Sequence, residues 1–149
     1  MPNKKITTSD LLKRLFQATN ITRFIEYHDK EMKRVPFYSY INMLCEKNNI
    51  VPERIIKKSG IDRTYGHQIF SGVRKPSRDK VIQLALGFEM DYGEAQELLR
   101  VARKSTLYPR VERDAVLIYA LNKRFGITDV QITLKDLNMP LLGKEDKYE

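Results

Sequence analysis

The segment SGIDRTYGHQIFSGVRKPS, residues 59–77, decides how the chain folds. Gly60 and Gly72 flank a short helical pattern within it. Glycine adopts the left-handed backbone that ends many helices, so both positions predict a helix end. Asp62 can accept hydrogen bonds from the exposed N–H groups of a first turn, which predicts a helix over residues 62–71. The segment therefore predicts two helices joined by a tight turn.

The predicted helix 62–71 has two unlike faces. Helical spacing places Tyr65, Ile69 and Phe70 on one side, with Gly66 among them. The opposite side carries polar side chains only: Arg63, Thr64, His67, Gln68 and Ser71. This division predicts that one face packs inward and that the polar face is exposed.

Helical periodicity extends over the whole chain and alternating strand patterns are nearly absent, so we expect an all-α fold. Further helix starts are predicted from N-cap and proline positions at Ser9 or Asp10, Asn20, Pro36, Pro52, Ser77 and Asp91, the last forming a capping-box-like pair with Glu94. Two more helices are predicted over residues 111–124 and 128–138.

These elements predict four segments. Residues 1–36 form a helical N-terminal extension, residues 37–90 a core domain, residues 91–142 a C-terminal helical extension, and residues 143–149 a frayed tail. The stretch AVLIYAL, residues 115–121, is apolar on all sides of its helix, which predicts burial on several sides. It is either an internal core helix or the seam of a homodimer, and both interpretations stay open.

Composition narrows the class of protein. The chain has 149 residues, 42% apolar and 31% charged, which is typical of a folded globular domain. Cys45 is the single cysteine, so no internal disulfide forms, and no signal peptide or membrane-spanning run occurs. We therefore expect a cytoplasmic protein with no membrane contact.

The positive charge is localised. The net charge is +8, and residues 1–77 hold fifteen basic and seven acidic side chains, whereas basic and acidic residues are equal in number beyond them. A localised basic field is typical of proteins that bind polyanions. Charge that only improves solubility is the alternative interpretation.

Residues 55–90, IIKKSGIDRTYGHQIFSGVRKPSRDKVIQLALGFEM, resemble the lambda-repressor-like (Cro/cI or XRE type) helix-turn-helix of bacterial and phage regulators. The resemblance rests on Gly60, the apolar turn residue Ile61, Ile69, Gly72 and the GVRKPS exit before an aliphatic helix. It covers about residues 38–90. The RDK and LYP…RDA segments are also similar to those of small regulators from Gram-positive bacteria.

This resemblance implies a sequence-specific DNA-binding transcriptional regulator, a nucleoid-associated homodimer that reads a palindrome in double-stranded DNA. The helix 62–71 would lie in the major groove, with Arg63, Thr64 and Gln68 at the positions the family uses for bases. Arginine pairs with guanine and glutamine with adenine through two hydrogen bonds. His67 and Ser71 can bond bases or phosphates, and Arg74 and Lys75 are expected to clamp phosphates.

The chain departs from the family at three places. Ile56 stands where the family has a small alanine, and Gly66 stands where it has isoleucine or valine. The two positions face each other across the turn, so we predict a size swap in which Ile56 fills the space above Gly66. Pro52 replaces a phosphate-contacting glutamine, and Asp62 is an acid near the DNA that we interpret as a helix cap.

Other functions have less support in the sequence. His28, His67 and Cys45 share no zinc-finger spacing, and no catalytic or nucleotide-binding motif occurs, so we expect no metal, no cofactor and no enzyme activity. The alternative is a helix-turn-helix-derived interaction module, adaptor or antitoxin-like, that binds a protein partner through the C-terminal helices and does not bind an operator.

Overall fold

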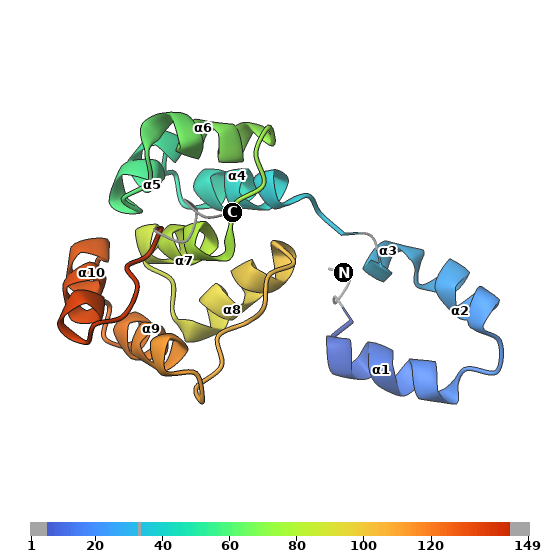
Figure 1. The fold of residues 1–149 in the computed structure, drawn as a ribbon. Coiled ribbons are helices and arrows are strands. Elements are labelled where there is room, and N and C mark those ends of the chain that lie inside the picture. The colour runs from blue at the N-terminus through green and yellow to red at the C-terminus, as the bar shows by residue number, and fades with distance from the viewer. Residues whose placement is uncertain (1–5, 33, 144–149) are drawn as a thin grey trace. The chain divides into compact units, whose positions relative to one another are not determined.

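The structure, a computed structural model, describes residues 6–32 and 34–143 (Figure 1). These residues form helices and no strand, which confirms the all-α class. The helices are α1 (Thr8–Gln17), α2 (Ile21–Tyr27), α3 (Asp29–Met32), α4 (Phe37–Lys47), α5 (Pro52–Lys58), α6 (Arg63–Ser71), α7 (Arg78–Gly87), α8 (Tyr92–Val101), α9 (Glu112–Asn122) and α10 (Ile127–Asp136). Within the described ranges, no helix is long and apolar enough to cross a membrane.

The chain divides into two compact units, Met1–Arg34 and Val35–Glu149. The segments 37–90 and 91–142, which the sequence interpretation separates, lie in the same unit and share one hydrophobic core. In the larger unit, α7 runs between the α4–α6 group and the α8–α10 group (Figure 1). Every residue of α7 from position 81 to position 87 is buried, so α7 is the central helix of this unit.

Local capping signals place most of the helix starts. Asp62 accepts a hydrogen bond from the Tyr65 N–H at 3.1 Å, as expected of a cap. Asp91 and Glu94 form the full capping box, with N–H to carboxylate distances of 2.8 and 3.1 Å. The predicted caps of α6 and α8 are therefore confirmed.

Three expectations differ from the structure. The cap of α1 is Thr7 instead of Ser9 or Asp10, because the Thr7 hydroxyl accepts from the Asp10 N–H at 3.1 Å and the helix starts earlier. The short helix α3 was not predicted. The tail was expected to start at Gly143, but this residue is still held in place, because its N–H donates a hydrogen bond to Asp79 Oδ2 at 3.0 Å. The rest of the expected tail, residues 144–149, lies outside the described ranges.

The segment 115–121 lies within α9 and contributes to the core of its own chain. Leu117, Ala120 and Leu121 are buried, whereas Tyr119 is half-exposed. One side of α9 therefore packs inside the larger unit, whereas the predicted burial on several sides does not extend to Tyr119.

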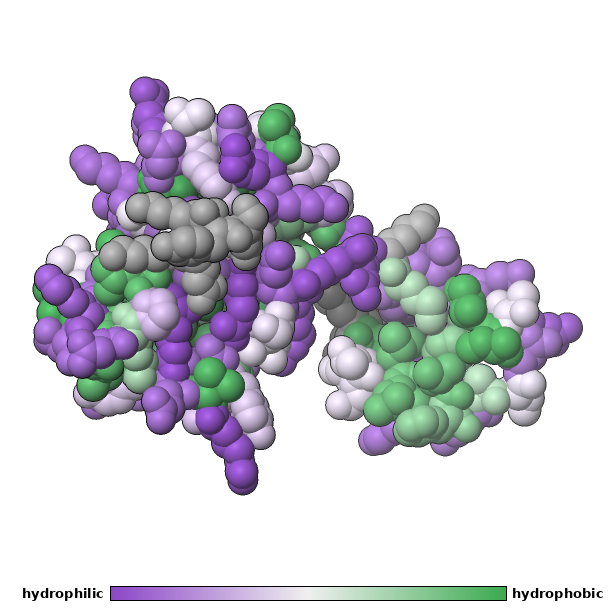
Figure 2. Space-filling view, in the orientation of Figure 1, coloured by the Kyte–Doolittle hydropathy of each residue, from purple (hydrophilic) through white to green (hydrophobic). Residues whose placement is uncertain are grey.

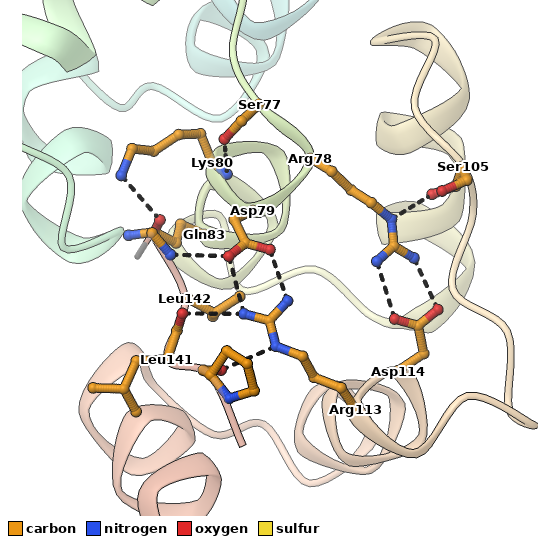
Figure 3. A network of polar contacts seen from close by, with 12 residues as sticks. Ser77, Arg78, Asp79, Lys80, Gln83, Ser105, Arg113, Asp114, Leu141 and Leu142 are labelled. Carbon is orange, nitrogen blue, oxygen red and sulfur yellow. Dashed lines mark hydrogen bonds and ion pairs between the residues drawn. The ribbon is translucent and has the colours of Figure 1, made fainter. Parts of the chain in front are cut away.

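Two Arg-Asp dipeptides, at the starts of α7 and α9, pair crosswise (Figure 3). Arg78 Nη1 and Nη2 lie 3.0 and 2.9 Å from the Asp114 carboxylate oxygens. Arg113 Nη1 and Nη2 each lie 2.9 Å from the Asp79 carboxylate oxygens. Both pairs are bidentate, which is the strongest geometry for an arginine and a carboxylate.

Each arginine of this network also binds backbone carbonyls. Arg78 donates to the carbonyls of Ser105 and Thr106 in the α8–α9 connection, and Arg113 donates to those of Pro140 and Leu141 after α10 (Figure 3). The network therefore fixes two loops against the start of α7. The two ion pairs therefore attach the loops of the C-terminal helices to α7, the central helix of the unit that also contains α6.

Candidate nucleic-acid interface

The helices α5 and α6 pack against each other and are joined by the turn 59–62. Gly60 has φ +68°, the left-handed conformation that ends α5, and the Ile61 N–H reaches back to the Ile56 carbonyl at 3.3 Å. Ile61 is buried at the turn and anchors it to the core. Gly72 has φ +83° and ends α6. Both glycines thus occupy the positions predicted from the sequence.

The predicted size swap at the α5–α6 crossing is confirmed. A Cβ placed on Gly66 would lie 2.5 Å from Ile56 Cγ2 and 2.7 Å from Ile56 Cγ1. These distances are far below the 3.5–4.0 Å of a normal carbon–carbon contact. The Ile56 side chain, which is 2% exposed, therefore occupies the space that a side chain at position 66 would need.

The polar residues of α6 share one open surface. Gly66, Ile69 and Phe70 are buried on the inner side of the helix. The opposite side forms a shallow depression lined by Arg63, Thr64, His67, Gln68 and Ser71. The structure thus brings together the five α6 residues that the sequence singled out.

Glu53, at the start of α5, extends this surface and was not predicted. Its Oε1 lies 2.8 Å from Arg63 Nε and its Oε2 lies 3.0 Å from His67 Nε2. The hydrogen bond from His67, followed by the bond and charge of Arg63, holds the pKa of the Glu53 carboxyl below its ordinary value. One carboxylate from α5 therefore orients two side chains of α6.

These contacts leave polar groups of Arg63 and His67 available for a further partner. Because Glu53 binds Arg63 through Nε, the two Nη groups at the end of the guanidinium keep the fork that fits the O6 and N7 acceptors of guanine. A ring nitrogen of His67 bonded to a carboxylate acts as a donor, so its Nδ1 is the nitrogen left for a further partner. Glu53 thus reduces the positive charge of the surface and pre-orients it.

Gln68 and Arg74 are also connected. Arg74 Nε donates to Gln68 Oε1 at 2.9 Å, and its guanidinium carbon lies 4.5 Å from the centre of the Tyr65 ring, a cation–π contact. A carboxamide oxygen has two acceptor sites, so Gln68 can accept from Arg74 and still pair with an adenine. Arg74 is therefore drawn to the edge of the α6 surface, and Lys75 is exposed beyond it.

The sequence could have suggested Tyr65 but not Glu53. Tyr65 follows from helix spacing, since it lies beside the polar face and is partly buried. Glu53 lies 10 and 14 residues before its two partners, on another helix, and only the crossing of α5 over α6 brings them together.

Comparison of the chain with protein-family models, with curated proteins and with solved structures finds no match to any of them.

Proposed function

We propose that the protein is a sequence-specific DNA-binding transcriptional regulator of the XRE type, with a lambda-repressor-like helix-turn-helix formed by α5 and α6. In this proposal α6 enters the major groove and its polar face reads base edges. One observation carries the proposal: Arg63, Thr64, His67, Gln68 and Ser71 line a single open surface on a helix whose other side is buried.

Each group has a role that its chemistry supports. Arg63, through its free Nη fork, is proposed to bind a guanine, and Gln68 to bind an adenine, each contributing roughly 1–3 kcal/mol of discrimination between bases. Thr64, His67 and Ser71 contact bases or phosphates. Arg74 and Lys75, which follow α6 in the exit loop, are proposed to bind backbone phosphates.

The charge distribution supports the same proposal. The excess of eight positive charges lies in residues 1–77, the part of the chain that contains α5 and α6. A basic field of this kind attracts the phosphate backbone regardless of sequence and makes affinity depend steeply on salt. Because one helix-turn-helix covers few base pairs, we propose that a homodimer binds two half-sites about 34 Å apart, one turn of DNA.

The experiment has two steps. DNA enriched from random oligonucleotides by the full-length protein gives the preferred sequence and the half-site spacing. Fluorescence anisotropy then measures affinity for that sequence and for a scrambled one over a range of salt concentrations. We expect a steep log–log salt slope and a preference for the selected sequence of about a thousandfold or more.

Variants separate base reading from general attraction. Arg63→Ala and Gln68→Ala are expected to lower affinity for the selected sequence by roughly 5- to 150-fold each and to leave binding to scrambled DNA nearly unchanged. Thr106→Ala, in the loop after α8, is the control away from α6. If both variants keep the sequence preference of the wild type, the proposal is contradicted. The proposal is also contradicted if the affinity of the wild-type protein does not depend on salt. Either result favours a protein-interaction module.

A further inference from the structure

A cavity of about 510 Å³ lies where the ends of α5, α7 and α9 meet the start of α10. The apolar residues that line it are Leu86, Met90, Leu121, Phe125 and Ile127. The first three are buried and the last two are half-buried. Sites for small molecules have volumes of about 300–1,000 Å³ and mostly apolar walls with a few polar groups. The cavity therefore has the size and the wall of a small-molecule site.

The charged side chains of the cavity are Lys58, Glu89 and Arg124. Lys58 Nζ lies 2.9 Å from Glu89 Oε1, whereas Arg124 Nη1 donates to the backbone carbonyl of Glu89 at 2.9 Å. The hydrogen bond and charge of Lys58, followed by the charges of Arg54 and Arg124, hold the pKa of the Glu89 carboxyl below its ordinary value. Three positive side chains thus act on one carboxylate, which leaves an excess of positive charge at the mouth of the cavity.

The start of α10 adds hydrogen-bond donors to the same cavity. Gly126 is the N-cap of α10, no side chain caps this helix, and Gly126, Ile127 and Thr128 all line the cavity. The first N–H groups of a helix have no partner within the helix and favour a negative charge. Asp129, the acidic residue of this first turn, is not among the lining residues. The helix start therefore reinforces the preference of the charged side chains for an anion.

The cavity also lies beside the turn that joins α5 to α6. Lys58 is the last residue of α5, and a Cβ placed on Gly60 would lie 3.1 Å from Ile127 Cγ1. The Ile127 side chain therefore packs directly on the glycine of the turn. A ligand in contact with Ile127 would be separated from the turn by this one side chain.

We propose that this cavity binds a small organic carboxylate, with its apolar body against the wall and its charged group between Arg124 and the start of α10. The wall removes the apolar body from water, and a guanidinium and the N–H groups of a helix start are strong donors to a carboxylate. The positive mouth repels a cation, and an uncharged ligand gains nothing from its charge. This proposal does not depend on DNA binding by α6.

Titration of the ¹⁵N-labelled full-length protein, followed by ¹H–¹⁵N correlation spectra, tests the proposal. The probes are two carboxylates of different shape, octanoate and 2-naphthoate, and their uncharged counterparts, 1-octanol and 2-naphthalenemethanol, each up to about 3 mM. We expect at least one carboxylate to shift the amide signals of residues 126–128 with a dissociation constant of about 1 mM or lower. Its alcohol counterpart should bind at least about fivefold more weakly.

Two variants should change the affinity in opposite directions. Arg124→Gln is expected to weaken carboxylate binding by about fivefold or more, because it removes the cation that Glu89 does not neutralise. Glu89→Gln is expected to strengthen it by about threefold or more, because it removes the negative charge and releases Lys58; loss of folding would not have this effect. Arg103→Gln is the matched control and should leave the affinity unchanged. Arg103 is also an exposed arginine, with φ +58° against +61° for Arg124, and it does not line the cavity.

The apolar side chains that gather over α1 and α2 offer a second surface for the probes, with Phe16 78% exposed (Figure 2). Signal shifts confined to residues 6–32, or no shifts with either carboxylate, would overturn the proposal. Equal affinities for each carboxylate and its alcohol would also overturn it, since the charge of the mouth would then play no part. Unchanged affinity in Arg124→Gln has the same consequence.

Discussion

The contact between Ile56 and Gly66 predicts an unusual pattern of stability changes. In wild-type protein, Gly66→Ala adds a Cβ that would lie 2.5, 2.7 and 3.0 Å from Ile56 Cγ2, Cγ1 and Cδ1. Overpacking of this kind costs about 1–3 kcal/mol, and the better helix propensity of alanine returns about 1 kcal/mol. We therefore expect Gly66→Ala to lower the free energy of unfolding by about 0–2 kcal/mol.

The same substitution should have the opposite sign when Ile56 is shortened. Ile56→Ala removes the three atoms that the new Cβ would meet, and at 2% exposure it should cost about 2–5 kcal/mol. In that background Gly66→Ala meets open space, gains helix propensity and partly fills the cavity, so it should stabilise by about 1–2 kcal/mol. The coupling energy between the two sites is then about 1–4 kcal/mol.

Urea unfolding followed by circular dichroism of the wild type, both single variants and the double variant gives this coupling directly. Gly93→Ala is the control in both backgrounds, because a Cβ on Gly93 in α8 meets only Asp91 Oδ1, at an ordinary 3.5 Å. If Gly66→Ala changes stability equally in both backgrounds, to within about 0.5 kcal/mol, the size swap is refuted.

Three further predictions concern charged side chains. Lys75→Ala is expected to weaken binding to all DNA sequences alike and to reduce the log–log salt slope by about 1 in anisotropy titrations; a change in sequence preference would contradict its role as a phosphate clamp. Because hydrogen bonds from His67 and Arg63 hold the pKa of Glu53 below 4.5, its ion pairs stabilise the folded chain above about pH 4.5 and lose that effect as the pH falls through the folded pKa. Melting temperatures of Glu53→Gln and wild type should therefore differ slightly near neutral pH and converge in acid, and a difference that grows in acid would exclude this cause. Arg113→Ala leaves Asp79, 1% exposed, without its bidentate partner and should cost about 3–5 kcal/mol in urea unfolding, whereas Arg113→Ala/Asp79→Ala should cost less than the sum of the single variants.

The sequence by itself determined the features that depend on neighbours within one turn of helix. Asp62 and Asp91 cap α6 and α8 as their positions indicate, because a cap bonds an N–H only two or three residues away. The polar face of α6 follows from helix spacing for the same reason, since residues 63, 64, 67, 68 and 71 share a side in any helix. Even the contact of Ile56 with Gly66 was foreseeable, through the resemblance of the segment to a known helix pair.

Only the tertiary structure decided which distant side chains meet. Glu53 joins Arg63 and His67 because α5 crosses α6, and Arg78 finds Asp114 across 36 positions because α7 and α9 start beside each other. The chain contains many other carboxylates, so the charge of an arginine or a histidine does not by itself determine which carboxylate it contacts. The α9 segment was open between core and interface for a related reason: an apolar surface requires cover, and its sequence does not state which surface provides it.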